Sequence, residues 1–208
     1  SLRAFKVVSG EHILFQGAHN DCVLDTVWSV KDTHLISVSR DRSMKLTEVA
    51  TQRFVDNVTS ITPGALKGGL LAVDRHPMKD ELLIGGADGI PKTYKMFRTK
   101  ARKIGDDFNR IRFFEKMPGR IFAVSYSPDG KLIAAGTSNN GKGEVRIFET
   151  DTGKKVSTIA GELGSIYTVA FTPDGKQLAS SGFDGMVRIH DARSGKLLKA
   201  FVSAPLKK

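Results

Sequence analysis

The feature that most constrains the fold is an internal repeat in the C-terminal half of the chain. Residues 125–149 are SYSPDGKLIAAGTSNNGKGEVRIFE, and residues 171–191 are FTPDGKQLASSGFDGMVRIHD. Aligning 121–160 with 166–202 gives a period of about 42–45 residues, the length of one four-stranded propeller blade. Such a chain is expected to stack several copies of one small sheet, because a single copy cannot cover its own apolar faces.

Each step of the alignment pairs residues of the same kind. An Ile-x-x-Val pattern opens both copies, at Ile121 and Ile166, and an S/T-P-D-G-K turn follows. We then align Leu132–Gly136 with Leu178–Gly182 as a second strand. In the PDG segments Pro presets φ, Asp bonds the backbone ahead and Gly accepts a positive φ, which predicts a tight turn. The later V-R-I triplets and Gly-Lys turns predict a third and a fourth strand.

Two weaker copies and a half copy come earlier in the chain. The half copy is expected to have a third strand over Leu2–Val8 and a fourth over His12–Gln16. We therefore predict one all-β domain over 1–208, a β-propeller of four-stranded antiparallel blades with about four and a half blades present. The predicted blades are 1–16 (a half blade), 17–67, 68–116, 117–160 and 161–208.

These segments together resemble the WD-repeat β-propeller family, in the spare bacterial form with S/T-P-D-G turns. The resemblance is strongest over 120–202, and it is weakest over 51–67 and 98–116. It implies a rigid ring that presents loops on two faces to protein partners. It also implies a hydrogen-bonded tetrad in each blade: a His before the first strand, a Ser or Thr on the second, an Asp in the next turn and a Trp on the third.

The tetrad is incomplete in every blade of this chain. His19 matches the family's His, and the turn Asp is matched by Asp41, Asp88 and Asp184. The Ser is matched by Ser37 or Ser39 in one blade and by Ser180 or Ser181 in another. The position of the Trp holds Phe5, Thr47, Tyr94, Phe148 and His190. The only tryptophan, Trp28, falls at the aromatic position of a first strand, where we expect it in the core.

Four and a half blades do not close a ring of the size usual in this family, about six to eight blades. Each end would leave a bare sheet face and an unpaired edge. Further blades could precede Ser1 in the native polypeptide, another chain could supply them, or the chain could close a small ring alone. We expect part of a ring of about seven blades, because a start at a third strand fits a cut chain.

Charge is concentrated in one insertion. The net charge is +10, from 32 Lys and Arg against 22 Asp and Glu, which favours anionic partners. Residues 98–110, named here the basic loop, lengthen a hairpin that should be short, and 92–120 holds ten Lys and Arg. The loop either grips an acidic partner or is simply solvated. If it binds, the candidate residues are Lys100, Arg102, Lys103 and Arg110.

Nucleic acid is not the expected partner. Binding a single strand would need aromatic side chains interleaved with the basic ones as stacking platforms. Phe108 lies in the basic loop, but Phe113 and Phe114 follow a strand pattern and are expected in the core. The single cysteine, Cys22, lies in an apolar run and is expected to be a buried small hydrophobe.

No motif in the chain predicts catalysis, a metal site or a cofactor. The five histidines have no short metal-ligand spacing, and neither a G-x-S-x-G elbow nor a phosphate-binding Gly-Lys-Ser/Thr loop occurs. No run of 18 apolar residues predicts membrane insertion. The sequence leaves the compartment open between the cytoplasm of a bacterium and export to its periplasm.

The resemblance therefore implies a non-enzymatic scaffold for protein–protein interaction. An alternative starts from the segments GGADGIPKTYKMFR and MPGRIFAVSYSPDG, which look similar to WD-repeat regions of large exported bacterial proteins with c-type cytochrome domains. In that case the redox function would lie outside this chain, because the chain has no C-x-x-C-H haem attachment motif.

Overall fold

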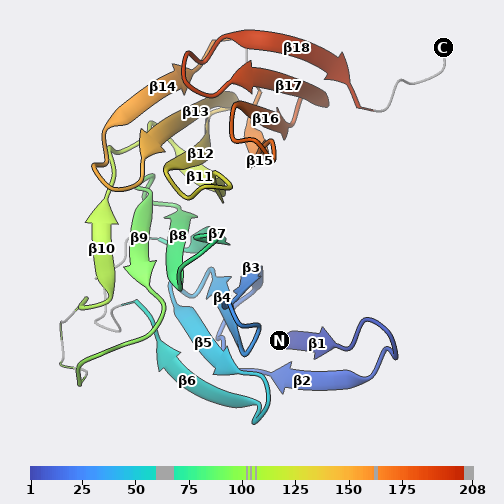
Figure 1. Cartoon of the computed structure of the whole chain (residues 1–208), viewed down its shortest axis with the longest axis vertical. Helices are drawn as coiled ribbons and strands as arrows, with labels where there is room; N and C mark the ends of the chain where they lie inside the picture. The colour runs from blue at the N-terminus through green and yellow to red at the C-terminus, as the bar shows by residue number, and fades with distance from the viewer. Residues whose placement is uncertain (60–67, 102, 104, 106, 162–163, 204–208) are drawn as a thin grey trace.

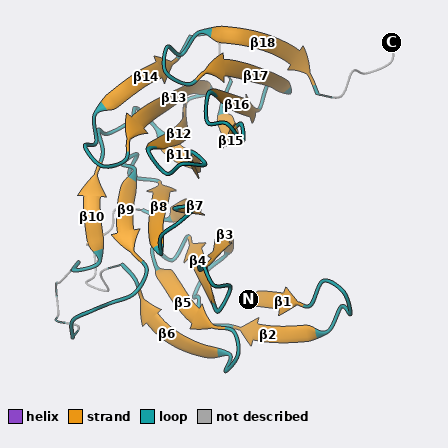
Figure 2. Cartoon of the chain, viewed as in Figure 1, coloured by secondary structure: helices purple, strands orange, loops and turns teal. Residues whose placement is uncertain are grey.

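The computed structural model describes the chain except residues 60–67, 102, 104, 106, 162–163 and 204–208. The described residues form four four-stranded antiparallel sheets and one two-stranded sheet, with turns and loops between them (Figures 1 and 2). The predicted all-β propeller architecture is confirmed.

Every four-stranded sheet is a simple meander, in which each strand pairs with the next one in the sequence. The half blade contains β1 (Leu2–Phe5) and β2 (His12–Gln16). Blade 2 contains β3 (Val23–Trp28), β4 (His34–Ser39), β5 (Met44–Glu48) and β6 (Arg53–Asn57). Blade 3 contains β7 (Leu70–Arg75), β8 (Glu81–Gly86), β9 (Lys92–Lys95) and β10 (Arg110–Phe113). Blade 4 contains β11 (Arg120–Tyr126), β12 (Leu132–Asn139), β13 (Lys142–Glu149) and β14 (Lys155–Ile159). Blade 5 contains β15 (Ile166–Phe171), β16 (Gln177–Gly182), β17 (Met186–Asp191) and β18 (Leu197–Val202).

The blades follow one another around an open arc (Figure 1). The first strands β3, β7, β11 and β15 lie on the inside, where each contacts the next, and the fourth strands lie on the outside. The arc is open between the half blade and blade 5. Ring closure therefore stays a prediction, as does the division of the chain into the five sequence ranges.

The core lies between the blades rather than within them. One apolar cluster joins blades 2 and 3, a second joins blades 4 and 5, and smaller clusters join blades 3 and 4 and the half blade and blade 2. The second strands of blades 2, 3 and 4 are buried on both faces, which suits their short runs of apolar and small residues, whereas β16 in blade 5 is only partly buried.

Small residues on the second strands allow neighbouring blades to approach closely. A Cβ added to Gly136 would come within 2.6 Å of the Cγ2 of Ile166, the first residue of the next blade's inner strand. Gly85 has the same relation to Ile121. Gly85 and Gly136 occupy equivalent positions, opposite Ala72 and Ala123. The glycines are therefore required for packing, and neither has a positive φ.

The predicted alignment of the second strands is wrong by one residue. Tyr126 pairs with Ile133, whereas the equivalent Phe171 pairs with Leu178, so Leu178 corresponds to Ile133 and not to Leu132. Hydrogen bonds in the turns support the same alignment. The backbone N–H of Leu132 donates to the Ser127 hydroxyl, and that of Gln177 donates to the equivalent Thr172 hydroxyl. The glycines that end LIAAG and LASSG therefore stand at different positions.

Four expectations about single segments are also wrong. Strand β1 ends at Phe5, and Val7 and Val8 are fully exposed in the hairpin that follows. Trp28 is 38% exposed, because the two strands of the half blade cover Leu35 of blade 2 but leave the Trp28 ring partly open. Cys22 is exposed, since it lies in the loop before β3. Phe113 is half exposed on the outer strand β10, whereas Phe114 is buried as expected.

Candidate functional site

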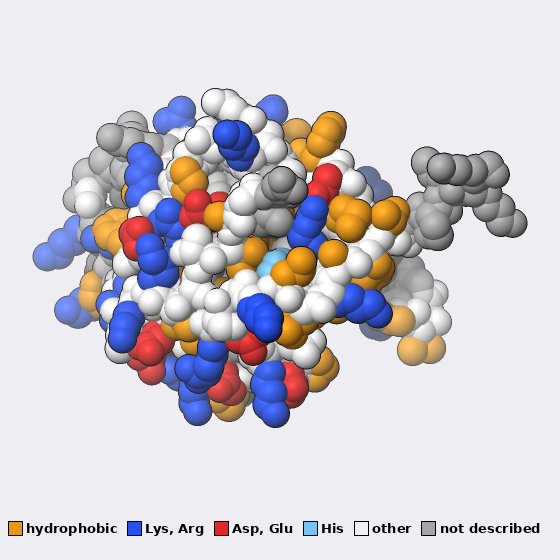
Figure 3. Space-filling model, turned by 90° about the horizontal axis from the view of Figure 1, so that it is seen from above, with side chains coloured by type: hydrophobic (Ala, Val, Ile, Leu, Met, Phe, Trp, Pro, Cys, Tyr) orange, Lys and Arg blue, Asp and Glu red, His pale blue; other side chains and the backbone are white. Residues whose placement is uncertain are grey.

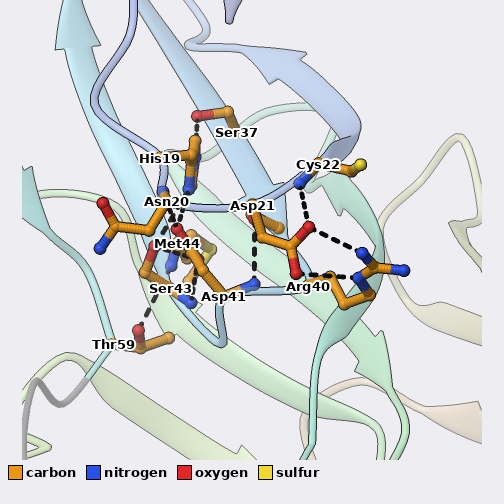
Figure 4. A network of polar contacts seen from close by, with 11 residues as sticks. His19, Asn20, Asp21, Cys22, Ser37, Arg40, Asp41, Ser43, Met44 and Thr59 are labelled. Carbon is orange, nitrogen blue, oxygen red and sulfur yellow. Dashed lines mark hydrogen bonds and ion pairs between the residues drawn. The ribbon is translucent and has the colours of Figure 1, made fainter.

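A hydrogen-bond network in blade 2 contains three of the four tetrad groups (Figure 4). The Nδ1 of His19 lies 3.0 Å from the Oδ2 of Asp41, and its Nε2 lies 2.7 Å from the Oγ of Ser37. Ser43 adds a hydroxyl that donates to Asp41 at 2.6 Å. Of the two candidate serines, Ser37 is therefore the one that bonds His19, and the hydroxyl of Ser39 accepts from the backbone N–H of Asp41.

The electrostatics of this network favour a fixed structural role. Burial lowers the pKa of His19, although the hydrogen bond to Asp41 opposes the shift. Burial alone would raise the pKa of Asp41, but hydrogen bonds from Ser43 and Asn20 outweigh it and bring that pKa to about 2. Thr47, at the position of the Trp, is buried, and its hydroxyl has no partner among the described residues. The network therefore ties the loop before β3 to the β4–β5 turn.

The other two turn aspartates bind basic residues instead of a histidine. Asp88 forms an ion pair with Lys92, whose side chain is 4% exposed. Asp184 forms an ion pair with Arg188 at 2.6 Å. The strand register places Lys45, Lys92, Arg146 and Arg188 at one repeat position. Blades 3 and 5 thus replace the tetrad with an ion pair across the second hairpin.

Apart from Arg110, which begins β10, the basic loop lies in the connection between β9 and β10. This connection spans 96–109, whereas the equivalent connections span only 49–52, 150–154 and 192–196. Lys100 lies over the ring of Phe108 at 4.8 Å. Arg110 pairs with Asp107 at 2.7 Å and lies over the ring of Phe113 at 4.2 Å. Two of the loop's basic side chains, Lys100 and Arg110, therefore already interact with other residues of this protein. Lys103 is exposed and Arg102 lies outside the described residues.

A second candidate surface is a set of apolar side chains near the starts of the inner strands. Each first strand contains a β-bulge near its start, where two of its residues oppose one residue of the second strand. A bulge turns a side chain away from the regular alternation of the strand. The extra residue is large and apolar in all four blades, and we name these residues the bulge row: Leu24, Leu71, Phe122 and Tyr167.

The bulge row is open to solvent at both ends. Leu24 is 46% exposed and Tyr167 is 50% exposed, while Leu71 and Phe122 are half-buried. The rings of Phe122 and Tyr167 meet edge to face with centroids 5.7 Å apart. The inner strands that carry Leu24, Leu71 and Phe122 also contact one another in sequence order.

A hollow of about 410 Å³ adjoins the row between blades 3 and 4. Its lining includes Phe122 together with Lys116, Arg120 and the amide side chains of Asn139 and Asn140. In an antiparallel meander the starts of the first strands share one end with the hairpins between second and third strands. The bulge row therefore lies at the opposite end of the blades from the basic loop, which joins a third and a fourth strand.

Sequence reasoning placed the bulge-row residues inside regular strands. The available signal was their shared position, one residue after the first apolar residue of each inner strand. If side chains alternated regularly along each inner strand, this residue would face a neighbouring blade. The bulge that changes its direction cannot be recognised from four short sequences alone.

The described part of the chain shows no group of three or more His, Cys, Asp and Glu side chains that could hold a metal ion. The same part has no helix of the length and apolarity needed to cross a bilayer.

The repeated four-stranded meanders define this protein as an all-β protein built from propeller blades. The family model "WD domain, G-beta repeat" matches residues 109–148 and 153–191. Each match begins near a fourth strand and ends at the third strand of the next blade, so the sequence repeat is offset by one strand from the blade. The two matches support a WD-repeat family for the chain, and repeats of this kind generally mediate protein–protein interactions. No curated protein matches the chain.

Proposed function

We propose that this protein is a non-enzymatic WD-repeat propeller that acts as an interaction platform for other proteins. The observation that carries the proposal is the bulge row, because the same backbone irregularity presents a large apolar side chain in four successive blades. Contiguous exposed apolar side chains beside polar ones are typical of protein-binding surfaces.

The chemistry of the surface suggests what it binds. The rings and aliphatic groups of the bulge row favour apolar side chains. In the adjoining hollow Lys116 and Arg120 favour carboxylates, because the carboxylate of Asp88 in the same lining is already paired with Lys92. The expected ligand is a protein segment that carries apolar and acidic residues close together.

We propose the basic loop as a second, independent contact. Lys100, Lys103 and Arg110 are exposed and would make charge contacts with an acidic partner, with Arg102 as a fourth candidate. The ion pair between Arg110 and Asp107 reduces the charge that this residue can offer. The solvated loop without a partner remains the alternative.

A further proposed partner is a sheet that covers the open face of blade 5. Ala134, Val145 and Ile147 in blade 4 are fully buried because blade 5 packs on them. The equivalent Val187 and Ile189 are only half-buried, and Phe201, equivalent to Ile159, is 41% exposed. Further blades, from the same polypeptide or another chain, would bury this face within a ring of about seven blades.

The experiment that tests the platform compares partner capture by wild type and two variants. L24S/Y167S removes the exposed ends of the bulge row, and K100E/K103E/R110E reverses the charge of the basic loop. We expect the first variant to lose the main partners, and the second to lose acidic ones. Recovery of every partner by both variants would contradict the proposal.

The alternative of a larger exported bacterial protein, with cytochrome c-linked function outside this chain, stays a prediction. No described contact favours it. A Soret band in the visible spectrum of the purified native protein would support it.

A further inference from the structure

The interface between blades 4 and 5 contains a cavity of about 340 Å³. Its lining consists of Thr158, Ile159, Ala160, Arg188, His190, Gly195 and Leu197. The cavity therefore lies in the outer part of the interface, where β14 faces β17 and β18. Figure 3 views the molecule from above Figure 1, the side on which β14 and β18 lie.

The preceding interface explains why a cavity exists. Between blades 3 and 4, the rings of Phe114 and Phe148 lie 5.4 Å apart and both are buried. The strand register places His190 at the position of Phe148, and Ile159 at the position of Phe114. Two large rings are thus replaced by an imidazole and an aliphatic side chain, which leave space that the rings fill elsewhere.

In the described part of the chain, one lining residue, His190, has an unpaired polar atom, and so does Ser180, which pairs with the lining residue Arg188 across the sheet. His190 is 3% exposed, and within the described residues its Nδ1 has no hydrogen-bond partner. Ser180, on the neighbouring strand, is 1% exposed, and its hydroxyl likewise has no partner there. A buried polar atom without a partner costs free energy, so a ligand that supplies a hydrogen bond to it gains affinity.

The charges in the cavity disfavour a small anion. Among the described residues of the lining, Arg188 is the only cation, and its ion pair with Asp184 largely neutralises it. Burial and the nearby Arg188 lower the pKa of His190, so the imidazole is neutral near neutral pH. The remaining features are apolar walls at Ile159 and Leu197, a neutral imidazole and a guanidinium group, which suit a flat ring with a polar edge.

We propose that this cavity binds an aromatic side chain of a partner protein, of the kind that carries an N–H or O–H donor. The ring packs between Ile159 and Leu197, and its donor bonds the imidazole of His190. The adjoining strand β18 is the edge strand of its sheet, and Leu197 and Leu198 at its start are exposed, so a partner segment can pair beside the cavity. The site shares no residue with the bulge row or the basic loop, so its test is independent of the proposed function.

The probe for the test is N-acetyl-L-tryptophanamide, titrated into the protein and followed by two-dimensional NMR. Saturable shifts are expected at residues that line the cavity. Two variants fill the cavity from opposite sides: His190→Phe copies Phe148, and Ile159→Phe copies Phe114. Each is expected to weaken binding at least about tenfold, because the space for the ring is lost. His12→Phe, on the distant half blade, is the matched control and is expected to bind as wild type does.

The result that would overturn the proposal is equal binding by wild type and both filled variants, or no saturable binding by wild type. If His190→Phe does not fold, Ile159→Phe decides alone. N-acetyl-L-phenylalaninamide lacks the ring N–H and is expected to bind several-fold more weakly. Equal affinity for the two probes would overturn the assigned hydrogen bond to His190.

Discussion

The side chain of Ile166 packs against the backbone of Gly136, so closely that an added Cβ would lie 2.6 Å from its Cγ2. Ile166 opens the inner strand of blade 5, and Gly136 lies on the second strand of blade 4. Ile121 and Gly85 repeat this contact between blades 3 and 4, whereas Val38 occupies the glycine's position between blades 2 and 3.

Gly136→Ala is therefore expected to destabilise the protein. The new methyl group must displace Ile166, and overpacking of this kind costs about 1–3 kcal/mol. The free energy of unfolding from urea denaturation measures the effect. Ser181 is the equivalent residue on the open face of blade 5, where no further blade packs in this structure. Ser181→Ala is the matched control, and an equal loss in both variants would contradict this account of the interface.

Removing only one partner of the Lys92–Asp88 ion pair is expected to lower the free energy of unfolding. Lys92→Met leaves the carboxylate of Asp88 without its cation in a largely buried position, which costs about 3 kcal/mol. Asp88→Asn combined with Lys92→Met removes both charges and keeps an acceptor for the backbone N–H of Ile90, so the double variant should regain most of the stability.

Lys131→Met provides the control for this pair. Lys131 and Asp129 are 3.8 Å apart and largely exposed, and such pairs contribute little. A Lys92→Met variant as stable as Lys131→Met would show that the buried pair does not stabilise blade 3.

Stability is expected to fall as the pH falls below the ordinary pKa of histidine, about 6.5. Burial lowers the pKa of His19, His76 and His190 in the folded state. Between the lowered folded-state pKa and the ordinary pKa of the unfolded chain, the unfolded chain binds more protons than the folded protein. The stabilisation is therefore complete above the unfolded-state pKa and decreases as the pH falls below it. Urea denaturation between about pH 7 and pH 5 measures this slope.

The variant His190→Phe removes one of these three groups and is expected to make the slope shallower. An unchanged slope would show that His190 does not contribute. Asp41 acts in a separate window, because its folded pKa of about 2 lies below the unfolded value. Its contribution should be lost only between about pH 4 and pH 2.

The sequence repeat was enough to predict the sheets, because the PDG turns and the alternation of apolar runs fix each strand by local chemistry. It was not enough to align Leu178 correctly, since Gln177 replaces Leu132 and the small residues that follow fit two registers. The exposure of Trp28 and Cys22 depends on neighbouring segments, which local patterns do not describe.

The two candidate surfaces differ in how far sequence could predict them. The basic loop was evident as an inserted run of charges, but its pairing of Arg110 with Asp107 and Lys100 with Phe108 depends on loop geometry. The bulge row was not predicted, because the direction of Phe122 and Tyr167 depends on a one-residue irregularity in the backbone.

The central claim is that the bulge row contacts a partner protein, and site-specific photo-cross-linking tests it most directly. A photoreactive phenylalanine would replace Tyr167 in the native polypeptide, and the same group would replace Lys176, an exposed residue in the turn at the other end of blade 5. The account predicts a partner cross-linked at Tyr167 and none at Lys176. Absence of any cross-link at Tyr167, or the same products from both positions, would contradict it.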